Sequence, residues 1–312
     1  MTIKKNIAVI DLGSNLTKLV VAKGELPLQV IHRSIYNTKT LKNAPKGIFN
    51  SRSIELIDRD ILEILKVTSK LECAPILGIA TSAFRTRSNG QEVIDQLNSK
   101  FHTSIQIIAG QREAQLVFDG AMASVPHSNK PVLVMDIGGG STEFIIGNET
   151  AILWKHSFDL GSTAITKWAE LSDPLTTDNL QYLRLNLEKL LMPLVDAMST
   201  YLPVSFIGTT GAFESFAQIL ESQKGNDKPV KSGYLFDPQY LDQILSELVQ
   251  SNSTERQNRE GIHPLRKDTI HLAAVIFQFV FHKTNFQTYT LSLGDVKEGL
   301  IMDFLSSNST IH

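Results

Sequence analysis

Three consecutive glycines follow a lone carboxylate in the stretch VLVMDIGGGSTEF, residues 132–144. Four apolar residues lead into Asp136, and after it the chain reads, in order, Ile137, Gly138, Gly139, Gly140, Ser141, Thr142 and Glu143. This pattern predicts a strand, a tight turn and a second strand, with the carboxylate at the tip. Consecutive glycines let backbone amides come close to a ligand, and phosphate is the ligand that most often uses such a loop. A plain hairpin that needs glycine only for its turn is the alternative.

A second copy of this pattern lies at the start of the chain. IAVIDLGSNLTKLVV aligns with VLVMDIGGGSTEFII without a gap, and Asp136 lies 125 residues after Asp11. That distance is about the size of a domain, so the repeat predicts two similar domains. Chance similarity between two apolar hairpins is the alternative, which the shared Asp-x-Gly weakens. The matched pairs are Asp11 with Asp136, Gly13 with Gly138 and Thr17 with Thr142.

Length and composition limit what kind of protein carries these hairpins. The 312 residues suffice for two domains, and 42% hydrophobic with 20% charged residues is typical of a globular protein. We expect a cytoplasmic protein, because no apolar run reaches the length of a membrane span and the start lacks the apolar core of a signal peptide. The net charge of -2 predicts no general attraction to nucleic acid or membrane. Cys73 is the sole cysteine and is given no function.

Between the two hairpins the pattern alternates helix and strand, which predicts an α/β fold. The polar loop TSAFRTRSNG follows a predicted strand at 76–80, and open α/β sheets bind ligands at the carboxyl ends of their strands. Arg85 in this loop could hold a phosphate by a two-pronged contact, or be an ordinary surface arginine. A helix is predicted over 53–70, another over 90–100 with Ser88 as its cap, and a strand over 104–109.

Glu113 lies in the first turn of the helix that follows the 104–109 strand. Acidic residues are favoured there by the helix dipole alone, so a structural role is one interpretation. The functional interpretation makes Glu113 a general base, because in-line attack on phosphorus needs a group that orients or deprotonates water.

The second half continues the alternation. GTTG at 208–211 is a glycine turn between a strand and a helix, a further candidate for phosphate or nucleoside contact. No two of the eight histidines have metal-ligand spacing, so the acidic residues favour a hard ion such as magnesium over zinc. The predicted segments are one helix over 176–200 despite Pro193, a strand over 204–207, a helix over 212–220, polar loops over 222–233 and 251–259, a buried helix over 264–281, a strand over 289–293 and a helix over 295–305.

With these residues assembled, the sequence resembles the exopolyphosphatase/guanosine pentaphosphatase (Ppx/GppA) family of phosphohydrolases, in a short two-domain form. The resemblance covers nearly the whole chain. The motifs that carry it are DLGSN at 11–15, ATSAFR at 80–85 with Asn89, IIAGQREAQL at 107–116, DIGGGSTE at 136–143, DLGS at 159–162, GTTG at 208–211, PLRKD at 264–268 and KEGL at 297–300.

The resemblance implies an α/β fold of two actin-like, ribonuclease H-like domains that enclose a cleft. Domain I is expected at 1–123, with the helix 297–312 packed back on it, and domain II at 124–296. Glu113 matches the catalytic glutamate that activates water, and Arg85 matches a phosphate-contacting arginine. Asp136 and Glu143 match carboxylates around a metal, Mg²⁺ or Mn²⁺. The expected phosphate-binding residues are Asp11, Gly13, Ser14, Asn15, Gly138, Gly139, Gly140, Ser141, Thr142 and Gly208.

Two places depart from the family pattern. The first loop has Leu16 and Lys18 where the family usually has Ser and Arg, and GTTGA at 208–212 replaces a double-glycine turn followed by Thr. Both departures fall in predicted binding loops.

Several functions compete. The leading hypothesis is release of terminal orthophosphate from inorganic polyphosphate, and hydrolysis of guanosine pentaphosphate (pppGpp) is the alternative. An actin-like ATPase or kinase and a non-catalytic polyphosphate or nucleotide sensor remain open, and so does a homodimer. Basic residues that could line a polyanion path, or be ordinary solvated surface, are Lys39, Lys42, Lys46, Arg256, Arg259, Arg266 and Lys267.

Overall fold

The structure is a computed structural model that describes residues 5–39, 47–126 and 129–309. Lys42 and Lys46, two of the candidate polyanion contacts, lie outside the described residues. The chain divides into two compact units, which are described separately. Unit 1 comprises Met1–Ala123 and Val296–His312, and unit 2 comprises Ser124–Asp295. Across the described residues, no helix combines the length and the hydropathy of a membrane span.

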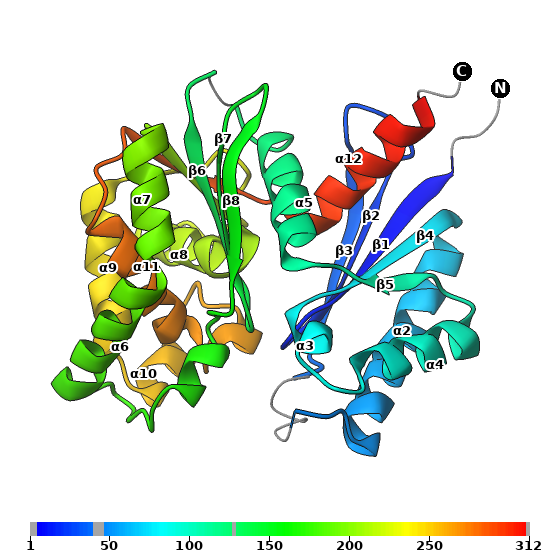
Figure 1. The fold of residues 1–312 in the computed structure, drawn as a ribbon, viewed down its shortest axis with the longest axis horizontal. Coiled ribbons are helices and arrows are strands. Elements are labelled where there is room, and N and C mark those ends of the chain that lie inside the picture. Colours follow the sequence, from blue (N-terminus) through cyan, green and yellow to red (C-terminus); the bar gives the residue numbers. More distant parts are fainter. Residues whose placement is uncertain (1–4, 40–46, 127–128, 310–312) are drawn as a thin grey trace. The chain divides into compact units, whose positions relative to one another are not determined.

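Unit 1 is built on a five-stranded mixed sheet (Figure 1). The antiparallel strands β1, β2 and β3 form one half, while β4 and β5 continue the sheet parallel to β1. The spatial order is β3-β2-β1-β4-β5. The strands are β1 (Asn6–Leu12), β2 (Thr17–Ala22), β3 (Val30–Tyr36), β4 (Cys73–Ala80) and β5 (Ile105–Ile107).

Helices cover both faces of this sheet because its central strand is apolar on both sides. Ala8 and Ile10 of β1 belong to one buried cluster with Ile57 and Ile61 of helix α2, whereas Ile7 and Val9 belong to another with Ile301 of helix α12. This division follows the alternation of side chains along a strand. Helix α12 also packs along helix α5 (Figure 1). The helices are α2 (Ser51–Lys70), α3 (Ser82–Arg85), α4 (Gly90–Phe101), α5 (Gly110–Met122) and α12 (Val296–Ser309).

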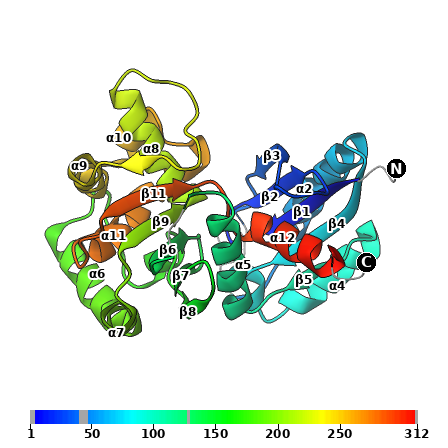
Figure 2. The same ribbon diagram turned by 90° about the horizontal axis from the view of Figure 1, so that it is seen from above.

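Unit 2 repeats the same sheet plan with one added edge strand. Its order is β10-β11-β9-β6-β7-β8, in which β6, β7 and β8 are antiparallel and β9 and β11 run parallel to β6 (Figure 2). The chain order of the shared strands therefore maps onto the sheet in the same way in both units. The strands are β6 (Val132–Ile137), β7 (Thr142–Gly147), β8 (Ile152–Phe158), β9 (Ser205–Thr209), β10 (Leu235–Phe236) and β11 (Thr288–Ser292).

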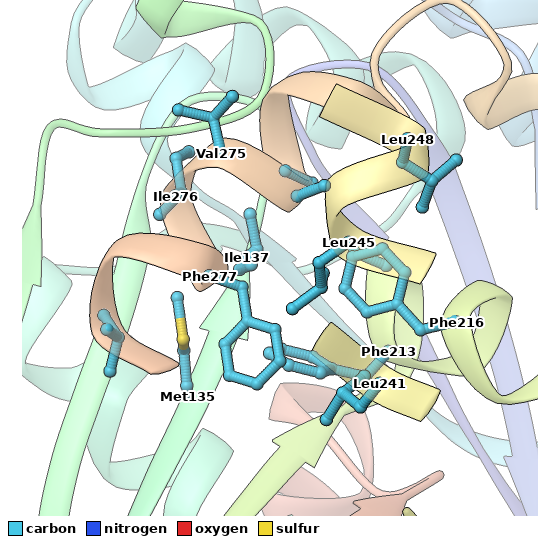
Figure 3. Close-up of a cluster of buried hydrophobic side chains, with 14 of the residues drawn as sticks. Met135, Ile137, Phe213, Phe216, Leu241, Leu245, Leu248, Val275, Ile276 and Phe277 are labelled. Carbon is cyan, nitrogen blue, oxygen red and sulfur yellow. The ribbon is translucent and has the colours of Figure 1, made fainter. Parts of the chain in front are cut away.

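The core of unit 2 is rich in aromatic side chains. Figure 3 shows Phe277 between Met135 of β6 and Phe213, and the rings of Phe213 and Phe277 meet edge to face with centroids 4.8 Å apart. Edge-to-face contacts between aromatic rings add to the stabilisation from burial. The helices are α6 (Thr177–Leu190), α7 (Met192–Tyr201), α8 (Thr210–Gln223), α9 (Pro238–Gln250), α10 (Ser253–Asn258) and α11 (Ile270–Phe281), with 3₁₀ turns η1 (Ala164–Lys167) and η2 (Pro264–Arg266).

Some predicted segments in unit 2 were wrong. The single helix over 176–200 is broken at Leu191, where φ is -93° and ψ is 11°, and Pro193 lies in the first turn of α7. Proline fits the first turn because its missing N–H has no partner there in any helix. The loop predicted over 251–259 contains helix α10, and the buried helix predicted over 264–281 is split into η2 and α11.

The predicted cap of helix α4 was also wrong. Asn89, not Ser88, is the N-cap residue, and its side chain makes no capping hydrogen bond. Instead, the Asn89 amide donates to the Phe49 carbonyl (3.0 Å), and its oxygen accepts from the Phe49 N–H (2.8 Å). Asn89 therefore connects the loop of residues 81–90, which contains Arg85, to the segment before α2.

Candidate active site

The two Asp-tipped hairpins predicted from the repeat are confirmed, and they have the same turn. The Gly13 N–H donates to the Leu16 carbonyl at 3.0 Å, and the Gly138 N–H donates to the Ser141 carbonyl at 2.9 Å. At both glycines a β-carbon would lie 2.9 Å from that same carbonyl oxygen. Glycine is therefore required by the turn at both places.

Three strand ends meet at one edge of the unit 1 sheet. The Thr81 N–H donates to the Leu12 carbonyl (3.2 Å), and the Ile108 N–H donates to the Ala80 carbonyl (3.1 Å). The carboxyl ends of β1, β4 and β5 are therefore adjacent, and each continues into a predicted functional segment. This edge is where open α/β sheets bind their ligands.

Arg85 and Glu113 form an ion pair at this edge. Arg85 Nη1 lies 2.5 Å from Glu113 Oε2 and also donates to the Ile108 carbonyl at 3.0 Å. The Glu113 side chain is only 9% exposed and that of Arg85 19% exposed. Glu113 stands in the first turn of α5, where its backbone N–H bonds to the Ala109 carbonyl.

The remaining guanidinium nitrogens of Arg85 are available to a ligand. Both of its hydrogen bonds use Nη1, and no described residue bonds to Nε or Nη2. Arginine presents five N–H donors in a planar fork, so the side carrying Nε and Nη2 suits two oxygens of one phosphate. The arrangement can hold a phosphate beside a carboxylate that is already oriented.

In unit 2, the segment after β8 closes over the glycine loop. The N–H groups of Ser162 and Thr163 donate to the carbonyls of Gly138 and Gly139, both at 2.9 Å. A β-carbon on Gly161 would lie 2.5 Å from the Gly139 backbone. The carbonyls of the loop are thus turned inward to this segment.

The carboxylates predicted to hold a metal stand opposite each other in the hairpin. Asp136 and Glu143 are register partners of β6 and β7, so their side chains leave the sheet on the same face. Glu143 is buried and accepts a hydrogen bond from Ser157 Oγ at 2.7 Å. No group of three or more potential metal ligands occurs among the described residues. The pair fits Mg²⁺, which proteins often hold by one or two carboxylates together with substrate phosphates.

The sequence did not predict a charged cluster around Arg266. Its guanidinium lies 3.8 Å from Glu214, and burial lowers its pKa while the charges of Glu214, Asp136 and Asp295 oppose that shift. Asp295 in turn accepts a hydrogen bond from the Thr210 hydroxyl (3.1 Å). These residues are far apart in the sequence, which predicted Arg266 as a possible polyanion contact but did not predict its acidic neighbours.

The GTTG turn is conformationally unusual. Thr210 and Gly211 have φ of 28° and 55°, so both backbones occupy the left-handed region. Gly208 lies two residues before Thr210, inside β9, where a β-carbon would meet the Phe213 ring at 2.3 Å. Packing against Phe213 explains this glycine, and its predicted phosphate contact stays a prediction.

Each unit therefore assembles its own share of the predicted site residues. Unit 1 carries the loop with Gly13, Ser14 and Asn15, the carboxylate Asp11 and the Arg85–Glu113 pair, while unit 2 carries Asp136, Glu143 and the loop from Gly138 to Thr142. Glu113 and Asp11 are buried.

Comparison with known proteins gives one consistent result. The sequence profile of the Ppx/GppA phosphatase family matches residues 19–308. A putative exopolyphosphatase of Haemophilus influenzae is 25% identical, over 95% of this chain and 90% of that protein. Exopolyphosphatase 2 of Mycobacterium tuberculosis is 23% identical, over 95% and 97%. The crystal structure of an exopolyphosphatase from Cytophaga hutchinsonii superposes with a TM-score of 0.92 and 27% identity, covering 97% of this chain and 98% of that one. The predicted α/β fold with two actin-like domains is confirmed.

Proposed function

This chain belongs to the Ppx/GppA phosphatase family, and we propose that it is an exopolyphosphatase that releases orthophosphate from the end of inorganic polyphosphate. The observation that carries the proposal is the Arg85–Glu113 pair, which joins a phosphate-binding fork to an oriented carboxylate at 2.5 Å. The names of the relatives, which are exopolyphosphatases, support this substrate over pppGpp.

In the proposed reaction, Arg85 binds the terminal phosphate through Nε and Nη2. Glu113 accepts a proton from a water molecule, whose oxygen forms a bond to the terminal phosphorus. The anhydride P–O bond opposite the water breaks, and the shortened chain leaves with the electron pair. A carboxylate that removes this proton lowers the barrier because the attacking oxygen gains negative charge as the bond forms.

The glycine loops bind phosphate oxygens through backbone N–H groups and the hydroxyls of Ser14 and Ser141. Asp136 and Glu143 would hold a divalent cation, Mg²⁺ or Mn²⁺, which neutralises charge on the phosphates when it is bound. Glu143 is held in place for this role by its hydrogen bond from Ser157.

A substrate panel tests the proposal. Purified protein with Mg²⁺ is given polyphosphate of graded length, pppGpp and ATP, and released orthophosphate is measured. We expect the largest kcat/KM on polyphosphate. A preference for pppGpp would assign the alternative activity within the family, and tight polyphosphate binding without turnover would identify a sensor.

A kinase would be distinguished in the same experiment. Phosphate transfer from ATP to a sugar or a carboxylic acid, with no orthophosphate released from polyphosphate, would contradict the proposal.

A further inference from the structure

Both units tie the segment after their third strand to the phosphate hairpin by a threonine hydroxyl. Thr17 pairs with Tyr36 in the β2–β3 register, and Thr142 pairs with Phe158 in the β7–β8 register. Two residues beyond each partner, the chain bonds back to the threonine. The Thr17 hydroxyl lies 2.7 Å from that of Thr38, and the Thr142 hydroxyl donates to the Leu160 carbonyl. We call residues 37–39 the β3 strap and residues 159–163 the β8 strap.

The next residue of each strap touches the phosphate loop. The Lys39 N–H donates to the Asn15 carbonyl at 2.6 Å, while Gly161 lies so close to Gly140 that a β-carbon would approach the Gly140 nitrogen to 2.6 Å. Asn15 and Gly140 occupy the same place in the two aligned hairpins. The two straps are thus equivalent, but unit 1 carries a lysine where unit 2 carries a glycine.

The backbone of Lys39 has a conformation that is unfavourable for any residue with a β-carbon. Its φ is 47°, in the left-handed region where glycine is free of strain and a β-carbon is not. Strain of this kind persists where the surrounding structure enforces it and often marks a functional site. A lysine at this position brings a positive charge to the segment that bonds to the predicted phosphate loop.

A buried hydrogen-bonded chain fixes the β3 strap. The Thr38 hydroxyl donates to Asp60 Oδ2 of helix α2 at 2.7 Å, and Arg59 Nη2 lies 2.7 Å from Asp60 Oδ1. Thr17, Thr38 and Asp60 are each 1% exposed. Because a buried carboxylate is costly unless it is paired and hydrogen-bonded, this network holds the strap in one place.

We propose that Lys39 is a phosphate-binding residue of the first hairpin, which binds a further phosphate of an inorganic oligophosphate behind the terminal one. Thr38 and Asp60 are positioning residues that hold Lys39 against Asn15. This inference rests on the proposed function, since it assigns one more contact of the same substrate.

The test compares Lys39→Gln, Lys39→Gly and Lys39→Arg with wild-type protein on tripolyphosphate and on long-chain polyphosphate. For Lys39→Gln we expect KM to rise about tenfold with kcat within about twofold, as for loss of one charge-assisted phosphate contact. The slope of log(kcat/KM) against log of salt concentration, which is negative for a polyanionic substrate, should become less negative by about one. Lys39→Arg should restore both values, because it keeps the charge.

The variant Lys39→Gly distinguishes the effect of the lost charge on KM from an effect of the substitution on stability. Glycine relieves the left-handed backbone, so this variant should be at least as stable as wild type and still show the raised KM. Thr38→Val, which removes the hydroxyl that reaches Asp60, should raise KM with the salt slope unchanged. The matched control is Lys66→Gln on the exposed face of helix α2, where Lys66 pairs with Glu63, and it should leave KM and the salt slope as in wild type.

Unchanged KM and salt slope in Lys39→Gln and Lys39→Gly would overturn the inference while leaving the proposed function intact. If wild-type protein releases no phosphate, the proposed function fails, and calorimetric titration with tripolyphosphate then decides on Lys39. Weaker binding by Lys39→Gln than by wild type would support the phosphate contact. Equal binding by the two proteins, or no binding by wild type, would contradict it.

Discussion

Arg85 and Glu113 reach each other from different elements, because α3 and α5 both begin directly after neighbouring strands. The proposed reaction makes two demands on this ion pair: Glu113 must remain oriented for water, and Arg85 must offer a fork to phosphate. The contacts of Arg85 Nη1 with Glu113 and with the Ile108 carbonyl meet the first need and leave Nε and Nη2 for the second.

Replacing Arg85 with lysine tests the fork. Lysine keeps the charge but cannot make a planar two-pronged contact, so we expect kcat/KM on polyphosphate to fall about 10- to 100-fold, which is a loss of about 1.4–2.7 kcal/mol. The matched control is Arg52→Lys, whose arginine is exposed and pairs with Glu55 in one turn of α2. Wild-type kinetics in Arg85→Lys would show that charge alone suffices.

At the scale of the element, helix α11 carries a buried histidine that should limit stability in acid. Burial and the charge of Arg256 lower the pKa of His271 from 6.5 to about 4, while the carboxylates of Asp173 and Asp268 act in the opposite direction. The folded protein therefore binds fewer protons than the unfolded chain between these values.

Stability should consequently fall as pH drops from 6.5 towards 4, by roughly 3 kcal/mol in total from this group. His271→Leu removes the titrating ring and should flatten this part of the pH dependence, measured by urea unfolding at a series of pH values. His282→Gln serves as control, since His282 is half exposed beside Asp242. An equal loss of stability in wild type and His271→Leu would contradict the assignment.

Helix α12 approaches the backbone of α5 closely at Gly299. A β-carbon on Gly299 would lie 1.9 Å from the Leu116 carbonyl oxygen, which belongs to the backbone of α5 and cannot turn away. Gly299→Ala should therefore force the helices apart and destabilise the protein by about 1–3 kcal/mol. Thermal unfolding measures this, with Ser307→Ala on the exposed side of α12 expected to stay within about 0.5 kcal/mol of wild type. An unchanged Tm in Gly299→Ala would show that the two helices adjust without cost.

For the whole molecule, the repeat that the sequence showed in 15 residues extends to the sheets. Asp, Gly and Thr at fixed positions predicted both hairpins because tight turns restrict residue type and strands repeat with period two. The strands β3 and β8 were not predicted. Their side chains are only partly buried along most of their length, so they lack the continuous apolar signal of central strands.

Candidate site residues were predicted from the sequence where a short motif after a strand marks them. Contacts between residues far apart in the sequence were not predicted. Glu113 and Arg85 follow strands directly, so their approach to one sheet edge could be expected from the order of elements. Arg266 and Asp295 meet the GTTG turn only through the folded chain, and the Thr38–Asp60 contact joins a strand exit to a helix interior. Hydrophobic periodicity and motif spacing do not predict such contacts, because the contacts depend on how whole helices and strands pack.

The most direct test of the account is orthophosphate release from long-chain polyphosphate by wild type and Glu113→Gln, measured side by side with saturating Mg²⁺. Glutamine keeps the size of the side chain and can still accept a hydrogen bond from Arg85, but it cannot take a proton from water. We predict that kcat falls about 10²- to 10⁴-fold while the melting temperature stays near that of wild type. Glu63→Gln, at an exposed carboxylate of α2, should keep full activity. A Glu113→Gln protein that releases phosphate at the wild-type rate would contradict the assignment of Glu113 as the base.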